Sequence, residues 1–309
     1  MDYLIFVASL ALLIVGADFI IRESERIALH FEIPAFIIGA TLIAVGTSLP
    51  EMAASMTASY HGKSELAVSN VLGSVTFNIT LVLGILFLLG KQIHPQRDLF
   101  AKDSAWALFP VLVFLLVGFD GTVDRFEGTV FVLLMLGYVL FLVYDAKELL
   151  EIDEELVKEK FAWVKTIALL TLGFILVVGG ADFTISSATA IAKTWGVSEW
   201  LIGLFLISFG TSLPELVVSI MAVKKGNADM AIGNIIGSNV ANFTMVLGGS
   251  AIISPLFIDT SSYAFDILIA VFASIMLLFI TANKLYNKSG GIALLLILAL
   301  FIHNAIGSL

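Results

Sequence analysis

The chain has 309 residues, of which 59% are hydrophobic and only 13% are charged. Soluble domains carry roughly 25% charged residues, so this composition excludes an ordinary water-soluble enzyme. The net charge of −9 argues against nucleic acid as a partner, and the absence of cysteine excludes disulfides and thiolate metal sites. Most of the chain consists of apolar blocks of about 20 residues, the length that crosses a bilayer. The composition therefore predicts an all-α polytopic membrane protein.

The apolar blocks predict ten transmembrane helices. In chain order they cover residues 3–29, 34–60, 66–90, 104–118, 128–145, 163–191, 198–223, 228–253, 263–282 and 290–307. The first block lacks a basic leader and a clear cleavage site, which favours a retained helix over a signal peptide. The connections are too short for an ATPase domain, and no Walker sequence is present. Any transport would therefore depend on ion gradients.

The basic residues predict the orientation of these spans. If the N-terminus is extracellular, 13 Lys and Arg residues fall on the cytoplasmic side and three on the other side. Cytoplasmic loops carry an excess of Lys and Arg, so this split predicts ten spans in the cell membrane with both termini extracellular. The acidic segment 148–162 would be the largest cytoplasmic loop. It lacks the ligand spacing of an EF-hand, so a solvated linker is favoured over a regulatory ion sensor.

An internal repeat divides the chain. Residues 39–84 align with residues 203–248 at a constant offset of 164, without gaps and with 21 identities over 46 positions. Each copy lies within a predicted unit of five helices, at residues 1–147 and 163–309. Because five is odd, the second unit would insert upside down relative to the first. This pattern predicts two inverted repeats with a substrate site near the membrane midplane.

Each copy contains the sequence Gly-Thr-Ser-Leu-Pro-Glu, ending at Glu51 and Glu215. Proline inside a helix lacks an N–H and clashes with the preceding turn, so Pro50 and Pro214 are expected to break their helices and release carbonyl oxygens. Free carbonyls at membrane depth are tolerated only inside the protein or along a watered cavity. Together with the adjacent hydroxyls and carboxylate they form an all-oxygen set, which suits hard cations such as Ca²⁺ or Na⁺.

Glu51 and Glu215 are the strongest candidate ligands. A carboxylate near the bilayer centre costs roughly 2.5–3.5 kcal/mol on insertion scales, and two such groups close together repel each other. A divalent cation between them would remove both penalties. The alternative is that each glutamate is protonated or paired with a basic residue, but no Lys or Arg lies in the interior of these spans.

The helix that follows each break carries a polar stripe. The stripes are Asn70, Ser74 and Asn78 in the first copy and Asn234, Ser238 and Asn242 in the second. Residues at i, i+4 and i+8 share one helix face, so these side chains could complete the shell of a cation. The alternative is that they only hold helices together, with the help of Gly233 and Gly237. Their duplication beside each glutamate favours the ligand interpretation.

Other polar residues predict no further site. Asp18 and Asp182 are related by the repeat and could gate, carry protons or anchor helix ends, of which anchoring is favoured. The four histidines are scattered and predict no metal site. The Ser and Thr residues at membrane depth have no His or Lys partner, which argues against an intramembrane enzyme. No cofactor and no obligatory protein partner are inferred.

The duplicated GTSLPE and N-x-x-GS-x-x-x-N segments resemble the α-repeats of the sodium/calcium exchanger family, within the cation/calcium exchanger superfamily. The resemblance covers the whole ten-helix layout and is strongest to compact prokaryotic or archaeal members. It implies an antiporter that exchanges Na⁺ for Ca²⁺ by alternating access. It also implies that Glu51 and Glu215 bind Ca²⁺ together with backbone oxygens of Thr47 and Thr211.

The resemblance further implies sodium sites that share these four residues. The additional sodium ligands would be Ala44, Ser48, Ser74, Ser208, Ser212 and Ser238, with Asn78 and Asn242 completing the centre. Family members often carry Asp at the position of Asn242, and potassium-dependent exchangers rely on it, so Asn speaks against potassium coupling. Proton/calcium exchangers carry a different acidic motif and remain the alternative within the superfamily. A passive cation channel is the alternative outside it.

Overall fold

The computed structural model describes residues 2–89, 93–148, 161–196, 208–259 and 263–307. Over these residues the chain is helical apart from its connections and one antiparallel pair of two-residue strands, β1 (Thr122–Val123) and β2 (Leu256–Phe257). The predicted all-α class is therefore confirmed. Most of the acidic segment 148–162 lies outside the described residues, as do residues 198–207 of the seventh predicted span.

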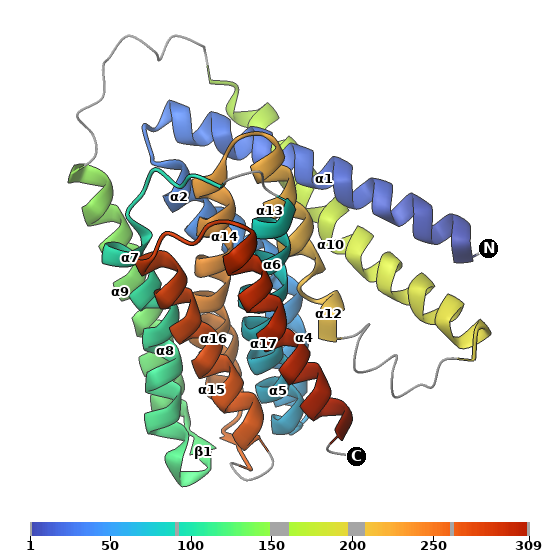
Figure 1. The fold of residues 1–309 in the computed structure, drawn as a ribbon, viewed down its shortest axis with the longest axis vertical. Coiled ribbons are helices and arrows are strands. Elements are labelled where there is room, and N and C mark those ends of the chain that lie inside the picture. The colour runs from blue at the N-terminus through green and yellow to red at the C-terminus, as the bar shows by residue number, and fades with distance from the viewer. Residues whose placement is uncertain (1, 90–92, 149–160, 197–207, 260–262, 308–309) are drawn as a thin grey trace.

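The first half of the chain begins with a long helix that is followed by a broken one (Figure 1). Its elements are α1 (Asp2–His30), α2 (Ala35–Ile38), η1 (Gly39–Ile43), α3 (Ala44–Thr47), α4 (Leu49–Tyr60), α5 (Ser64–Phe77), η2 (Asn78–Val82), α6 (Leu83–Leu89), α7 (Leu99–Lys102), α8 (Ser104–Val117), η3 (Gly118–Asp120) and α9 (Arg125–Glu148). The turns η1 and η2 are π-helical, and η3 is a 3-10 turn.

The second half follows the same order of elements where it is described. Its elements are α10 (Trp163–Thr194), α12 (Ser208–Gly210), α13 (Leu213–Lys224), α14 (Ala228–Ala241), the π-helical turn η6 (Asn242–Leu247), α15 (Gly248–Ile253), α16 (Ala264–Ala282) and α17 (Lys288–Gly307). In both halves a long helix precedes a helix that starts at a Leu-Pro-Glu sequence, and the next helix contains a π-helical turn.

Seven helices among the described residues are long and apolar enough to cross a membrane. They are α1, the continuous helices α5–α6 and α14–α15, and α9, α10, α16 and α17. The segments Ala35–Thr47 and Leu49–Tyr60 make an eighth if they form one span, with a bend of 47° between them. All eight coincide with predicted spans, and α8 is a shorter apolar helix at the position of another. A multi-pass membrane protein is therefore confirmed.

The bend of the second predicted span falls at Ser48, directly before the Leu49-Pro50 pair. Proline fits the first turn of a helix because its missing N–H would have no intrahelical partner there. The second copy repeats this geometry, since α13 begins at Leu213-Pro214. The predicted breaks therefore occur as new helix starts.

α14 lies in the interior, and every residue from Met230 to Ala241 is buried. It packs against α2 and η1 through two glycines. A Cβ atom at Gly233 would lie 2.4 Å from the Phe36 carbonyl oxygen, and one at Gly237 would lie 2.3 Å from the Ala40 carbonyl oxygen. Only glycine permits so close an approach between two backbones. This contact brings the second half of the chain onto the broken helix of the first half.

α1 and α10 pack along each other and run obliquely beside the upright bundle (Figure 1). Small residues permit a close approach, since a Cβ atom at Gly16 would lie 2.7 Å from the Gly173 carbonyl oxygen. The buried hydroxyl of Thr184 donates a hydrogen bond to Ser9 Oγ at 2.8 Å. These contacts join the repeat-related first helices of the two halves into one unit.

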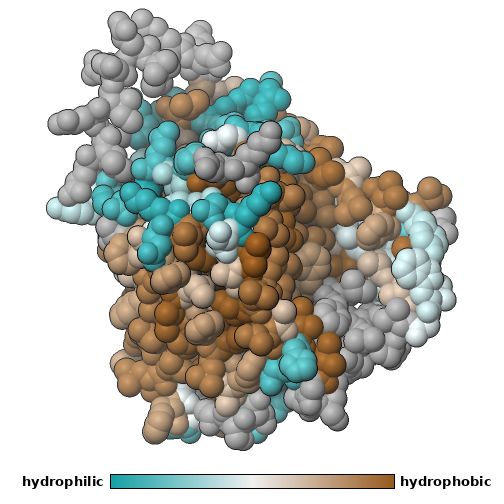
Figure 2. Space-filling view, in the orientation of Figure 1, coloured by the Kyte–Doolittle hydropathy of each residue, from teal (hydrophilic) through white to brown (hydrophobic). Residues whose placement is uncertain are grey.

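The flank of the bundle is apolar and one end is polar (Figure 2). The Arg97 guanidinium forms ion pairs with Asp103 and Asp145, and Lys102 pairs with Asp145 as well. The Arg97 guanidinium also lies 4.6 Å from the centre of the Phe36 ring. Burial raises the pKa of Asp103 to about 6 although Arg97 beside it favours the charged form. This network ties the segment before α8 to the end of α9 and to α2.

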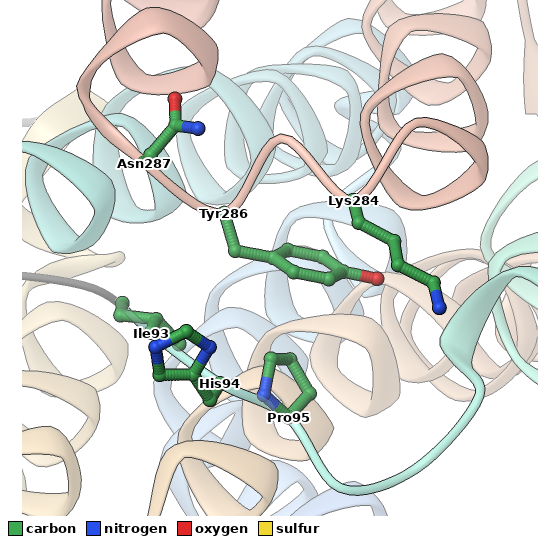
Figure 3. Close-up of a pocket in the computed structure, with 6 residues that line it drawn as sticks. All are labelled: Ile93, His94, Pro95, Lys284, Tyr286 and Asn287. Atoms are coloured by element: carbon green, nitrogen blue, oxygen red, sulfur yellow. The ribbon is translucent and has the colours of Figure 1, made fainter.

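A small pocket lies at a connection between α16 and α17 (Figure 3). Its lining residues are Ile93, His94, Pro95, Lys284, Tyr286 and Asn287. The Ile93 N–H donates to the Tyr286 carbonyl oxygen at 3.4 Å. Burial raises the pKa of Tyr286 to about 12. None of the residues that line this pocket is a predicted ion ligand.

Candidate ion-binding site

Glu51 and Glu215 lie in the first turns of α4 and α13, and both side chains are fully buried. The start of a helix presents unpaired N–H groups and the positive end of the helix dipole, so it stabilises a negative charge. No group of three or more His, Cys, Asp or Glu residues in the described part of the chain could hold a metal ion. A cation between these two carboxylates would therefore take its other ligands from hydroxyls, amides and carbonyls.

Residues of the two repeat copies interdigitate at this centre. Ser48 of the first copy donates a hydrogen bond to Glu215 Oε1 of the second copy at 3.2 Å, and Ser238 Oγ donates to the same oxygen at 3.4 Å. The hydroxyl oxygens of Ser74 and Thr211, which also come from different copies, lie 3.5 Å apart. The structure thus brings together side chains that are more than 130 residues apart in sequence.

Several buried polar atoms at this centre have no hydrogen-bond partner among the described residues. They are Glu51 Oε1 and Oε2, Glu215 Oε2, Asn78 Oδ1 and Nδ2, Asn242 Oδ1 and Ser212 Oγ. An unpaired buried polar group costs about 1–3 kcal/mol, and a charged one costs more. All but one of these atoms are oxygens, which are the ligands that hard cations such as Ca²⁺ prefer. These unpaired oxygen atoms are therefore suitable ligands for a cation.

Asn78 and Asn242 begin the π-helical turns η2 and η6. A π-helical turn changes the backbone hydrogen-bond pattern from i→i+4 to i→i+5, and such turns are frequent at functional sites. The sequence predicts helices over 66–90 and 228–253 but does not predict these π-helical turns within them. A π-helical turn does not change the hydrophobic pattern of the sequence, so that pattern cannot predict it. The one signal in the sequence is that both asparagines hold the same position in the repeat.

Comparison with known proteins identifies the family. A sequence profile of the family described as "Sodium/calcium exchanger protein" matches residues 1–144 and 165–307. This chain belongs to the sodium/calcium exchanger family. The resemblance seen in the repeated segments is thereby confirmed, and with it the expectation of an ion exchanger.

Two archaeal relatives match over nearly their full length. The membrane protein MJ0091 of Methanocaldococcus jannaschii is 36% identical over 297 residues, which cover 96% of this chain and 94% of that protein. The sodium/calcium exchanger MaX1 of Methanosarcina acetivorans is 29% identical over 344 residues, covering 97% of both. The solved structure of the sodium-calcium exchanger NCX_Mj soaked with 10 mM Na⁺ and zero Ca²⁺ matches with a TM-score of 0.84, at 32% identity and over 98% of both chains.

Two further predicted ligands, Thr47 and Ser48, lie at the break between α3 and α4. The Thr47 hydroxyl, which has one hydrogen to donate, lies 3.1 Å from the Ile43 carbonyl oxygen and 3.3 Å from the Ala44 carbonyl oxygen. The Ser48 N–H donates to the Ala44 carbonyl oxygen at 3.0 Å. Ser208 is the first residue of α12, and its side chain lies outside the described part of the structure.

Asp18 and Asp182 do not join the carboxylates at the centre. Lys225 Nζ lies 2.6 Å from Asp18 Oδ1 and donates to the Asp18 carbonyl oxygen at 3.3 Å. This pair joins α1 to the end of α13, which supports the favoured anchoring role. Asp182 is exposed on α10.

Two buried serines at the site were not foreseen. Ser55 and Ser219 lie one helical turn beyond Glu51 and Glu215, and both are buried. They are identical residues at equivalent positions of the repeat, which was the available signal. A single serine in an apolar helix does not by itself predict a functional role, because its hydroxyl can donate to a carbonyl oxygen of the preceding turn of the same helix.

Proposed function

We propose that this chain is a secondary active antiporter that exchanges Na⁺ for Ca²⁺ across the membrane by alternating access. The observation that carries the proposal is the burial of Glu51 and Glu215, one from each repeat copy, among oxygen atoms without hydrogen-bond partners. Two carboxylates supply a charge that one Ca²⁺ neutralises. The family supports this choice of ions, and NCX_Mj structures were obtained after soaking with Na⁺, Ca²⁺ or Sr²⁺.

In this proposal Ca²⁺ binds to Glu51 and Glu215 and to backbone oxygens of Thr47 and Thr211. Sodium ions use the same four residues. Their other ligands are Ala44, Ser48, Ser74, Ser208, Ser212 and Ser238, with Asn78 and Asn242 completing the centre. Because both cations need both carboxylates, the occupancy of the site by Na⁺ and by Ca²⁺ is competitive.

Shared carboxylates also account for obligatory exchange. An empty centre carries two negative charges, and moving buried unpaired charge past a dry barrier costs several kcal/mol per ion. A centre neutralised by cations escapes this penalty and can be exposed to the other side. α1 and α10, which pack as one unit and contribute no proposed ligand, would be the moving element. If three or more Na⁺ move per Ca²⁺, each net charge adds about 2.3 kcal/mol per 100 mV of membrane potential.

We further propose that the chain has ten spans in two inverted five-helix repeats, at residues 1–147 and 163–309, joined by a cytoplasmic segment at 148–162. The eight candidate spans, together with α8 and α13, supply the ten segments. The excess of basic residues on one side supports a cell-membrane protein with both termini extracellular. The network around Arg97 and the loop with Lys284 would then face the cytoplasm.

The proposal is tested by Ca²⁺ uptake into proteoliposomes under Na⁺, K⁺ and H⁺ gradients that are imposed one at a time. An outward Na⁺ gradient is expected to drive uptake, and neither other gradient is expected to do so alone. Uptake driven by a proton gradient would favour an H⁺/Ca²⁺ exchanger, and a requirement for K⁺ would favour a potassium-dependent one. Ca²⁺ entry without any counter-ion would favour a passive channel. Protein-free liposomes provide the background.

Replacing Asn242 by aspartate is expected to change the ion dependence of exchange. The Asn242 amide donates to the Ser238 carbonyl oxygen at 3.0 Å, and its own oxygen is buried without a partner. Asn242→Asp would add a titratable charge to a centre that already holds two carboxylates. We expect the rate of Ca²⁺ uptake to become more sensitive to pH or to K⁺, while the melting temperature stays near that of the unmodified protein. If the rate of Ca²⁺ uptake depends on pH and on K⁺ as it does in the unmodified protein, the central position of Asn242 is contradicted.

A further inference from the structure

One turn beyond each glutamate, a serine is held by an asparagine of the neighbouring helix. In the first copy Asn70 Nδ2 donates to Ser55 Oγ at 2.8 Å, and in the second copy Asn234 Nδ2 donates to Ser219 Oγ at 3.0 Å. Both serines and Asn234 are buried, and Asn70 is partly buried. The same contact therefore forms twice, at equivalent positions of the repeat, between the helix that carries the glutamate and the helix that follows it.

The orientation of each amide is fixed by its surroundings. Ser219 Oγ donates to the Ala231 carbonyl oxygen at 3.4 Å, so its oxygen is left to accept from the Asn234 NH₂ group. In the first copy the Asn70 NH₂ group also reaches the Glu51 carbonyl oxygen, at 3.4 Å, and a carbonyl oxygen only accepts. Both asparagines thus turn their NH₂ groups toward the glutamate-bearing helix.

The second pair extends to a ligand of the opposite copy. Since the Asn234 NH₂ group faces Ser219, its oxygen faces the other way and lies 3.2 Å from Thr47 Oγ1, as one of several oxygen atoms within reach of the single Thr47 hydroxyl hydrogen. A continuous chain of contacts therefore runs from α13, through Asn234, to the residue beside the break of the first copy. Removal of the Asn234 side chain would therefore end its contact with α13, which carries Glu215, and its contact with Thr47.

We propose that Asn70 with Ser55, and Asn234 with Ser219, are positioning pairs that set the affinity of the exchange site for Ca²⁺. Each pair fixes the glutamate-bearing helix against its neighbour, and Asn234 also orients Thr47. This inference rests on the proposed exchange of Na⁺ for Ca²⁺ at Glu51 and Glu215. Groups that hold metal ligands from behind typically change metal affinity by 10–100-fold when they are removed.

The test uses Ser219→Ala and Ser55→Ala in proteoliposomes, with Ca²⁺ uptake measured as a function of Ca²⁺ concentration. We expect the KM for Ca²⁺ to rise about tenfold in each variant, with a smaller change in the maximal rate. The increase in melting temperature that Ca²⁺ produces in detergent should shrink as well. Ser274→Ala is the control, because Ser274 is equally buried but donates only to Ala270 within its own helix, at 2.9 Å. Its KM should stay unchanged.

A double-mutant cycle separates positioning from general loosening of the protein. Asn234→Ala alone and Asn234→Ala with Ser219→Ala should have the same KM, since the serine acts through the asparagine. Additive effects in this cycle, an unchanged KM in both serine variants, or an equal rise in Ser274→Ala would overturn the inference. An unmodified protein without Na⁺-driven Ca²⁺ uptake would instead contradict the proposed function, so the two failures are distinguishable.

Discussion

Replacing Glu51 or Glu215 by glutamine is expected to abolish Ca²⁺ uptake driven by an outward Na⁺ gradient. Glutamine keeps the shape of the side chain but removes one of the two buried charges at the centre. Two unit charges 4 Å apart attract each other by about 4 kcal/mol at an effective dielectric constant of 20, which corresponds to about a thousandfold in affinity. The loss of affinity for Ca²⁺, which carries two charges, should be at least this large. Ca²⁺ flux in proteoliposomes and the Ca²⁺ dependence of the melting temperature measure it.

Glu65→Gln is the matched control for this experiment, because Glu65 also lies in the first turn of a helix but is exposed to solvent. It should exchange at the normal rate. Both Glu51→Gln and Glu215→Gln should stay folded in the absence of Ca²⁺, since removing one of two neighbouring buried carboxylates relieves repulsion. Full activity in both variants would reject the assignment of the site.

A methyl group at Gly237 is expected to reduce both stability and transport severely. The Cβ atom of Gly237→Ala would lie 2.3 Å from the Ala40 carbonyl oxygen and 2.6 Å from Ala40 Cα, which are backbone atoms and cannot rotate away. α14 must therefore move off η1, at a cost of about 1–3 kcal/mol or more. This movement also displaces Asn234 and Ser238, which touch Thr47 at the ion-binding centre. The melting temperature and the rate of Ca²⁺ uptake should both fall.

The repeat supplies an internal control for this prediction. Gly73 holds the equivalent position in the first copy, but a Cβ atom there would meet no atom of the described residues within 4 Å. Gly73→Ala should fold and transport normally, and it should gain about 0.5–1 kcal/mol because alanine favours the helix more than glycine does. A Gly237→Ala variant that is as stable and as active as the unmodified protein would contradict the close packing of α14 on η1.

Much of the fold follows from the sequence because a membrane restricts the possible structures. The length of the apolar segments predicts the eight candidate spans that the structure contains, and Pro50 predicts the bend that lies at Ser48. The polar residues of the duplicated segments do lie in contact. The spans and the bend are local features, since each depends on residues within one helix.

The contacts between helices were not predictable in the same way. Nothing in a linear repeat states that Ser48 of one copy will donate to Glu215 of the other, because that depends on how two helices cross. The π-helical turns at Asn78 and Asn242 also leave the apolar pattern unchanged. Ser55 and Ser219 became visible as part of the site only when their asparagine partners were placed beside them.

Coupled movement of Na⁺ and Ca²⁺ through one shared site is measured by counter-flux. Liposomes containing the purified protein are loaded with Na⁺, and the release of Na⁺ is followed as Ca²⁺ is added outside. We expect Na⁺ release to require external Ca²⁺, to occur in a fixed ratio to Ca²⁺ uptake and to disappear in Glu51→Gln. Na⁺ release without Ca²⁺, or Ca²⁺ uptake without Na⁺ release, would contradict exchange at one shared site.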